Sequence, residues 1–278
     1  MIGFIKQIKW IVVKMVPEKI EPEPEIEQPK YLQKSAMRYP QTAVRAILNE
    51  TKRLFEGPTF EIVAHALSIH RDDIKSEAKL GQIIKDSRTP INVDIDGVYY
   101  GKVKSIYSSI ITFATNIQAA FTLEPARTKS INRIKNANRL IVEVIKDSKS
   151  IKINVDKYLA SDNKYIQAQY DAMRKKVSKI YRKIYLLSLE IDPQKHHKTI
   201  KRLLEANKRS DVFENGTLDK LIRENRITSE MATSLANDSA TITSIVQNLL
   251  KVAELLYVDG DAIVNALPES EVEFEESY

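Results

Sequence analysis

The chain contains no cysteine, which excludes disulfide bonds, thiolate metal sites and a cysteine nucleophile. Glycine and proline are also scarce, with 7 and 10 among 278 residues, so few positions interrupt a helix. The sequence has no Gly-rich phosphate loop and no HExxH or GxSxG motif. These absences favour a helical protein that is not an enzyme.

Apolar residues recur at alternating steps of three and four over long stretches, which is the spacing of one face of a helix. Three such stretches precede Pro125 and three follow it. We therefore predict an all-α fold of two antiparallel three-helix bundles, at residues 30–124 and 125–260. The six long helices are predicted at residues 36–55, 59–84, 99–120, 134–159, 166–191 and 227–256.

Acidic segments flank this predicted body. Residues 17–29, PEKIEPEPEIEQP, hold four prolines and five glutamates, which favours an extended spacer. The last helix is predicted to end at Asp259-Gly260, because glycine commonly terminates helices. Residues 261–278 then form a tail with five glutamates.

The first sixteen residues, MIGFIKQIKWIVVKMV, are apolar but also basic. A membrane span needs about 20 apolar residues, and burying three lysines there is too costly. The lysines are also spread through the segment, unlike those of a signal peptide. We predict an amphipathic helix at a membrane interface, with a helix packed on the protein's own core as the alternative. Its interfacial apolar residues are Phe4, Ile8, Trp10 and Ile11, and its basic residues are Lys6, Lys9 and Lys14.

Residues 127–209 are strongly basic, with 22 Lys and Arg against 8 Asp and Glu. Such a region contacts an anionic partner or forms a solvated helical face. No DNA- or RNA-binding signature accompanies it, which disfavours nucleic acid. The candidate residues facing a membrane or another anion are Arg174, Lys175, Lys176, Lys179, Arg182 and Lys183.

Glu143 and Asp147 are a candidate metal pair. Their spacing of four places both carboxylates on one helical face, where their oxygens suit a hard cation. Asp73 and Glu77 have the same spacing. One pair supplies few ligands, and a solvated helix surface is the alternative, so the sequence establishes no cofactor.

The stretch PKYLQKSAMRYPQTAVRAILNETKRLFE, residues 29–56, resembles the start of the cytosolic C-terminal region of bacterial sodium/phosphate cotransporters. That region is related to the PhoU family of phosphate-regulatory proteins. The resemblance continues through residues 64–84, 99–113, 163–184 and 226–250. The residues at the positions of the opening motif are Tyr31, Leu32, Ser35, Ala36, Pro40, Ala43 and Glu50.

The resemblance implies a PhoU-like fold of two three-helix bundles. Proteins of the PhoU family bind metal clusters through repeated ExxxD motifs, of which Glu143–Asp147 is the one clean instance here. The resemblance therefore implies a divalent or iron-type metal at acidic helix pairs. It also implies a phosphate transporter membrane subunit as partner. The basic residues of the N-terminal segment and of the helical body indicate acidic lipids as a second partner.

We therefore expect a non-enzymatic regulatory module of sodium-dependent phosphate transport. We expect it to be peripheral, at the cytoplasmic face of the cell membrane. One alternative is a cytosolic phosphate-signalling adaptor that binds a sensor kinase or a response regulator. A second is nucleic-acid binding through residues 127–209. The sequence leaves homo-oligomer formation open.

Overall fold

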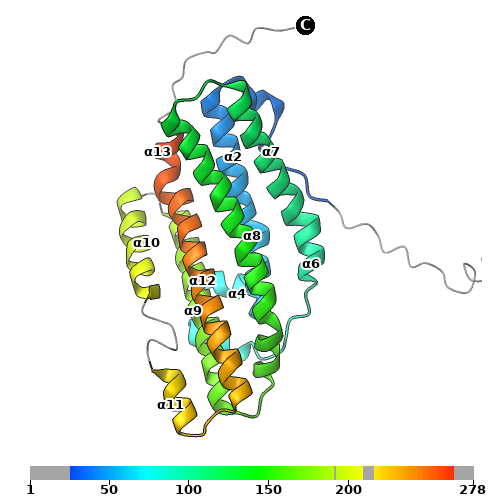
Figure 1. The fold of residues 1–278 in the computed structure, drawn as a ribbon, viewed down its shortest axis with the longest axis vertical. Helices are drawn as coiled ribbons and strands as arrows, with labels where there is room; N and C mark the ends of the chain where they lie inside the picture. Colours follow the sequence, from blue (N-terminus) through cyan, green and yellow to red (C-terminus); the bar gives the residue numbers. More distant parts are fainter. Residues whose placement is uncertain (1–25, 191, 209–215, 266–278) are drawn as a thin grey trace, which may run out of the picture.

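The described residues of the computed structural model are 26–190, 192–208 and 216–265, and within these ranges the chain is helical with no strand (Figure 1). The predicted all-α class is confirmed. The predictions for the amphipathic helix at residues 1–16, most of the acidic spacer and the end of the acidic tail lie outside the described residues.

Long helical segments lie side by side along the long axis of the molecule (Figure 1). Three of them contain a short π-helical turn, after α2, before α7 and after α12. The long segments are α2 (Pro40–Leu54) with Phe55–Thr59 and α3 (Phe60–Ala66), α6 (Ile95–Val98) with Tyr99–Lys104 and α7 (Ser105–Ala120), α8 (Pro125–Leu159), α9 (Lys164–Leu189), and α12 (Ser229–Glu254) with Leu255–Asp259 and α13 (Gly260–Asn265). The shorter helices are the 3-10 helix Lys34–Arg38, α4 (Arg71–Lys75), α5 (Leu80–Asp86), α10 (Pro193–Lys208) and α11 (Thr217–Arg223).

The predicted apolar seams are buried. Pro125 occupies the first turn of α8, where its missing N–H is not needed, and Ile134, Ile141 and Ile145 of this helix are buried. Asn163 caps α9 by accepting hydrogen bonds from two backbone N–H groups of its first turn. The buried face of α9 follows the predicted steps of four and three, with Ile166, Tyr170, Met173, Val177, Ile180, Ile184 and Leu187.

The hydrophobic core is one continuous cluster that reaches from Ala43 to Val264. Helix α8 contacts α2, α3 and α7 of the predicted first bundle and α9 and α12 of the predicted second bundle. The predicted boundary at Pro125 coincides with the turn between α7 and α8. The helices on the two sides of that turn therefore share a core.

The helices predicted separately at residues 36–55 and 59–84 are joined, because a π-helical turn accommodates Pro58 between them. Proline has no N–H, so the carbonyl of Leu54 loses its usual donor four residues later. The hydroxyl of Thr59 takes over and donates to that carbonyl at 2.8 Å. The helical segment consequently continues from α2 into α3.

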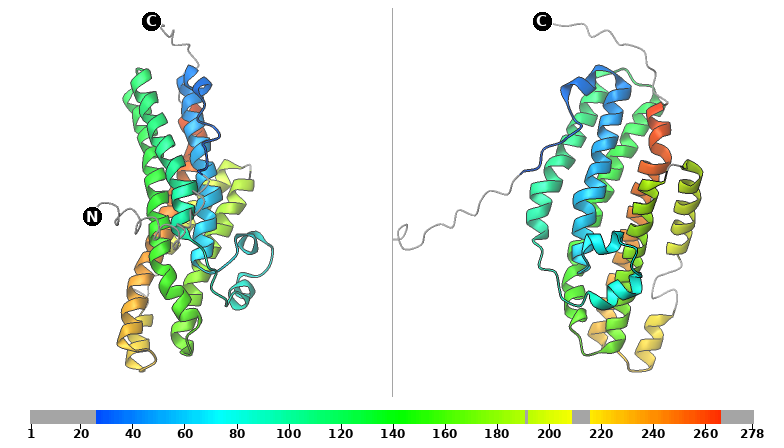
Figure 2. Two further views of the ribbon diagram at one scale, coloured as in Figure 1. Left: turned by 90° about the vertical axis from the view of Figure 1, so that its right-hand side faces the viewer. Right: turned by 180° about the vertical axis from the view of Figure 1, so that it is seen from behind.

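The prediction of one helix over residues 59–84 is wrong beyond Ala66, where α3 ends. There the chain turns at Ser68, which has a left-handed φ of 53°, and the short helices α4 and α5 follow. Figure 2 shows this segment projecting from one side of the bundle. Its apolar residues, such as Ile74 and Ile84, still reach the core, so their spacing indicated burial and not helix length.

Gly260 does not end the last helix. It has helical backbone angles, and the chain continues as α13 to Asn265, with Ile263 and Val264 buried. A Cβ atom at position 260 would lie 3.1 Å from Leu48 Cδ2. Glycine therefore permits the close approach of α13 to α2, and the helical body extends past the predicted start of the tail.

Candidate functional site

Glu50 fastens the beginning of the described chain to α2. Its side chain is fully buried, and Oε2 accepts hydrogen bonds from the backbone N–H groups of Lys30 and Tyr31, both at 2.7 Å. Its other oxygen accepts from Arg53 Nε at 2.6 Å. The two ends of the motif from Tyr31 to Glu50 therefore meet in space, which gives the motif a structural role as a clamp.

The last residues of the predicted acidic spacer also contact the helical body. Glu27 forms an ion pair with Arg53, and its backbone N–H donates to the carbonyl of Gly101 at 2.9 Å. The hydroxyl of Ser105 donates to the carbonyl of Glu27 at 3.0 Å. The clamp therefore holds the chain against both α2 and the helical segment that contains α7.

Arg174 was predicted to face an anion, and the structure contradicts this. Its side chain is 0% exposed on α9. The guanidinium donates to four carbonyl oxygens of the segment that connects α3 to α6 and to the carboxylate of Asp171. The planar guanidinium carries five N–H donors, which replace water in this interior position. The four carbonyls belong to Leu67, Ser68, Ile84 and Ser87.

The other five basic candidates on α9 divide into two groups. Arg182 donates to the carbonyls of Asp73, Ile74 and Ala78, and half-buried Lys176 donates to Thr243 Oγ1 at 3.2 Å. These two residues therefore join helices. The remaining three recur at every fourth position and form a narrow stripe along α9, which we call the lysine stripe: Lys175, Lys179 and Lys183.

The structure gives each residue of the candidate metal pair a protein partner. Glu143 lies 3.6 Å from Arg139 Nε, and Asp147 accepts a hydrogen bond from Ser244 of α12 at 3.3 Å. Burial raises the pKa of Asp147 and so disfavours its charged form. Across the described ranges, no three His, Asp or Glu side chains converge as a metal-binding group. The pair alone stays a prediction.

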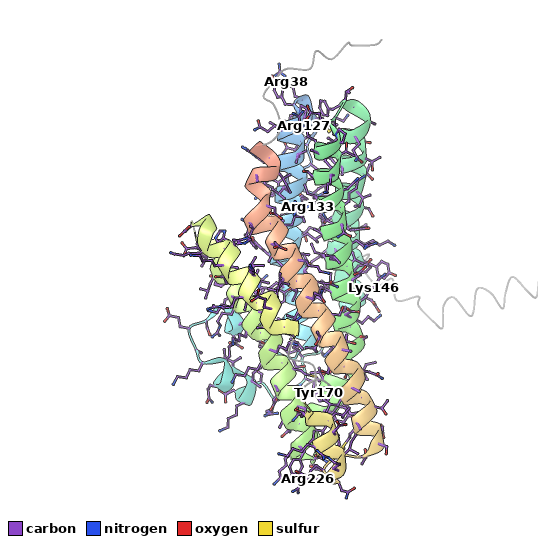
Figure 3. All side chains as sticks on the ribbon, turned by 60° about the vertical axis from the view of Figure 1, so that its left-hand side comes forward. Arg38, Arg127, Arg133, Lys146, Tyr170 and Arg226 are labelled. Carbon is purple, nitrogen blue, oxygen red and sulfur yellow. The ribbon has the colours of Figure 1, made fainter. Side chains whose placement is uncertain are left out.

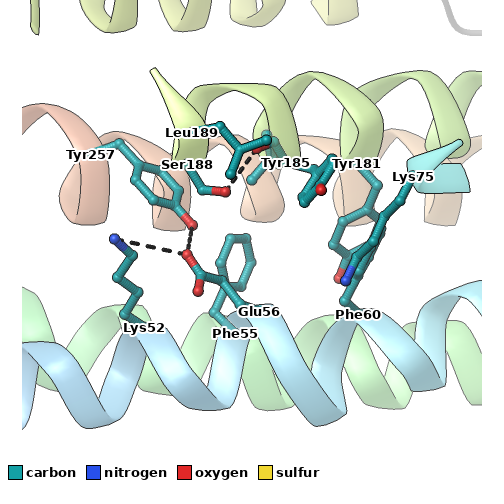
Figure 4. A pocket seen from close by; sticks show the side chains of 11 residues that line it. Lys52, Phe55, Glu56, Phe60, Lys75, Tyr181, Tyr185, Ser188, Leu189 and Tyr257 are labelled. Carbon is teal, nitrogen blue, oxygen red and sulfur yellow. Dashed lines mark hydrogen bonds and ion pairs between the residues drawn. The ribbon is translucent and has the colours of Figure 1, made fainter. Parts of the chain in front are cut away.

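A pocket of about 300 Å³ lies between α2, α9 and the turn Leu255–Asp259 (Figure 4). At one end, the hydroxyl of Tyr257 donates to Glu56 Oε1 at 2.5 Å, and Lys52 Nζ lies 3.9 Å from the same oxygen. At the other end are Tyr181 and Lys75. Its polar residues therefore come from α2, the turn Phe55–Thr59, α4, α9 and the turn Leu255–Asp259.

His196 contacts the backbone of Tyr257, one of the residues that line this pocket. It is buried, and its two ring nitrogens contact the carbonyl oxygens of Tyr257 at 2.7 Å and of Glu190 at 3.0 Å. These contacts join α10 to the end of α9 and to the turn that carries Tyr257. The sequence pattern does not predict this pocket, because its lining comes from segments far apart in the chain. The signal that the sequence offers is the set of aromatic residues at positions 55, 60, 181, 185 and 257.

A buried polar contact joins α8, α9 and α12, near Tyr170 in Figure 3. The hydroxyl of Tyr170 donates to Asp238 Oδ2 at 2.6 Å, and Asn154 Nδ2 donates to the same oxygen at 3.0 Å. Burial raises the pKa of Asp238, while the two hydrogen bonds oppose the rise. The charged form of this residue is therefore disfavoured in the folded protein.

We expect the stability of Asp238→Asn relative to the wild-type protein to increase as pH rises from about 4 towards neutrality. A raised carboxyl pKa means that the folded state binds the proton more tightly than the unfolded state. The native Asp238 therefore stabilises most below its unfolded pKa and loses this contribution as pH rises through the folded pKa. Urea unfolding at several pH values measures the difference, with Asp72→Asn on an exposed position as control. A gain that does not change with pH would contradict the assignment.

In comparisons with known proteins, no family model, no curated protein and no solved structure matches this chain. Among the described residues, no helix combines the length and the apolar character needed to cross a membrane.

Proposed function

We propose that this chain is a non-enzymatic, PhoU-like regulatory module of sodium-dependent phosphate transport at the cytoplasmic face of the membrane. The observation that carries the proposal is the clamp at Glu50, which fixes Lys30 and Tyr31 to α2. A module tethered through its N-terminal segment needs a fixed attachment, so that the position of the tether determines the position of the body. The clamp meets that need within the motif that resembles the cotransporter family.

The arrangement of the helices supports the PhoU-like part of the proposal. Long helical segments lie on both sides of the turn between α7 and α8, as two linked bundles require. In this proposal the helices before that turn form one bundle and those after it form the other. The shared core then couples the two bundles, so that a partner bound to one influences the other.

The use of the buried polar residues supports a role without catalysis. Glu50 holds a backbone segment, Arg174 holds the connection between α3 and α6, and Asp238 joins three helices. Each of these groups is occupied by a contact that maintains the fold. Hydrogen-bond networks and packed helices of this kind are the elements through which proteins couple distant sites.

In this proposal the predicted amphipathic helix provides the membrane contact, and the lysine stripe provides a further contact with acidic lipids. A Lys or Arg close to an acidic membrane surface contributes about 1 kcal/mol of binding free energy. The exposed Lys175 and Lys179 are available for such a contact.

We expect the full chain to co-sediment with vesicles that contain phosphatidylserine and to bind neutral phosphatidylcholine vesicles more weakly. Replacing Lys6, Lys9 and Lys14 by Glu should weaken the binding to acidic vesicles by roughly a hundredfold or more, because three attractive charges are lost. A matched control is the triple variant of exposed lysines away from the stripe, Lys79→Glu, Lys85→Glu and Lys146→Glu, which has the same charge change. Equal binding to acidic and neutral vesicles would contradict the lipid contact.

A pull-down from membranes with the full chain tests the partner. The proposal expects a phosphate transporter membrane subunit to be recovered. Recovery of a sensor kinase or a response regulator without transporter subunits would overturn it and favour a signalling adaptor. Nucleic-acid binding that falls steeply with salt would instead favour the basic region as a nucleic-acid interface.

A further inference from the structure

We propose that the pocket between α2, α9 and Leu255–Asp259 binds a small organic anion with a planar apolar body. Its volume of about 300 Å³ is within the range of small-molecule sites in proteins. The pocket contains no residue of the lysine stripe, and its lining begins at Lys52, well after the predicted amphipathic helix. The proposal is therefore independent of membrane association.

Aromatic rings provide the surface for the apolar body of the ligand. The ring centroids of Phe60 and Tyr181 lie 3.8 Å apart, and Phe55 lies 6.4 Å from Tyr181. Leu189 belongs to the same lining and is 62% exposed, so a bound molecule would cover apolar surface that now faces water. Aromatic surfaces of this kind favour a planar ring system over a flexible chain.

The charges of the pocket favour an anion. Glu56 is already engaged by Tyr257 and Lys52 (Figure 4). Lys75 Nζ lies 5.6 Å from the ring of Phe60 and 5.2 Å from the ring of Tyr185. Among the described residues, it has no carboxylate partner within ion-pair distance. A cation held only over aromatic faces gains a stronger, charge-assisted contact when an anionic group binds beside it.

Tyr181 provides a hydrogen-bond donor in the same part of the pocket. Its side chain is buried, and its hydroxyl has no hydrogen-bond partner among the described residues. Burial raises the pKa of Tyr181, so the hydroxyl remains protonated and can donate. A buried polar group without a partner destabilises the folded protein, and an oxygen of the ligand would satisfy it. Lys75 and Tyr181 together thus select a carboxylate or sulfonate group attached to an apolar ring.

The experiment uses the full chain and a pair of fluorescent probes that differ mainly in charge. These are 8-anilinonaphthalene-1-sulfonate and its neutral analogue N-phenyl-1-naphthylamine. We expect the sulfonate to bind with one-to-one stoichiometry. Lys75→Gln should weaken its binding by about tenfold and change that of the neutral probe by less than about twofold. Lys79→Gln, an exposed position four residues away, is the matched control and should leave both affinities unchanged.

Tyr181→Phe separates a binding role from a structural one, because it keeps the ring and removes only the hydroxyl. We expect this variant to bind the sulfonate roughly threefold to tenfold more weakly and to unfold at an equal or higher urea concentration. A lower unfolding midpoint would mean that the hydroxyl has a structural partner and would overturn the proposal. Wild-type affinity in either Lys75→Gln or Tyr181→Phe, or binding that does not saturate at one site, would also overturn it.

Discussion

Replacing Arg174 by Met is expected to lower the free energy of unfolding by about 3–5 kcal/mol. Methionine fills a similar volume but donates no hydrogen bond, so the carbonyl oxygens of Leu67, Ser68 and Ser87 lose their buried partner. We expect the connection between α3 and α6 to detach from α9 in this variant. Urea unfolding measures the loss of stability, and limited proteolysis at residues 67–95 measures the detachment.

Two further variants make this prediction specific. Lys175→Met removes the same charge from the neighbouring exposed position and should change the stability by less than about 0.5 kcal/mol. Arg174→Lys should also be less stable than the wild-type protein, because a single ammonium group cannot reproduce the planar set of donors of a guanidinium. Wild-type stability in Arg174→Lys would show that charge alone, and not the hydrogen-bond geometry, holds the segment.

Replacing Glu50 by Ala is expected to release the N-terminal clamp and to destabilise the body by about 2–4 kcal/mol. The backbone N–H groups of Lys30 and Tyr31 lose their acceptor, and Arg53 loses its buried carboxylate partner. Hydrogen exchange of these two amides should become at least about tenfold faster, a change that global unfolding alone would not confine to this segment. Mass-spectrometric hydrogen exchange on peptides that cover residues 26–35 provides the measurement.

Glu77→Ala, at an exposed position, is the control for this variant and should leave both the exchange and the stability unchanged. Glu50→Gln keeps one acceptor oxygen and should lie between Ala and wild type. If Glu50→Ala left the amide exchange of residues 30 and 31 unaltered, the clamp would not be the attachment that our functional proposal requires.

The two residues perform the same physical task at different places. Each is a buried charged side chain that supplies hydrogen bonds to a non-helical backbone segment. Without these hydrogen bonds, polar backbone groups of the segment would be unpaired where it lies against the bundle. Arg174 supplies donors to carbonyls, and Glu50 supplies an acceptor to N–H groups. Both are charged residues on amphipathic helices, and the sequence pattern by itself places such residues on the solvent face.

The all-α class and the buried seams of the long helices could be read from the sequence. Burial of an apolar side chain is nearly independent of its exact partner, so a repeat of three and four residues is sufficient evidence for a helix face. Ile141 on α8, Val177 on α9 and Leu249 on α12 are buried as their spacing predicts. Pro125 and Asn163 likewise mark helix starts through local chemistry that needs no tertiary contact.

The irregular regions could not be read in this way. The helical segment passes through Pro58 in a π-helical turn, where Thr59 satisfies the carbonyl of Leu54, and the helix stops after Ala66 although apolar residues continue. Gly260 lies inside a helix, where its missing side chain permits close contact with Leu48. In each case a specific neighbour outweighs the local propensity of the residue, and that neighbour is not visible in the local pattern.

The sequence alone therefore determines that this protein is helical, which faces of its long helices are buried and how its charge is distributed along the chain. Only the tertiary structure decides which charged residues are available to a partner: it buries Glu50 and Arg174, uses Arg182 to hold carbonyls and leaves Lys175 and Lys179 of the lysine stripe exposed. It also brings Lys52, Lys75, Tyr181 and Tyr257 into one pocket. The reason is physical. A hydrophobic pattern is local and periodic, whereas hydrogen bonds to buried charges depend on which distant backbone groups lie within about 3 Å.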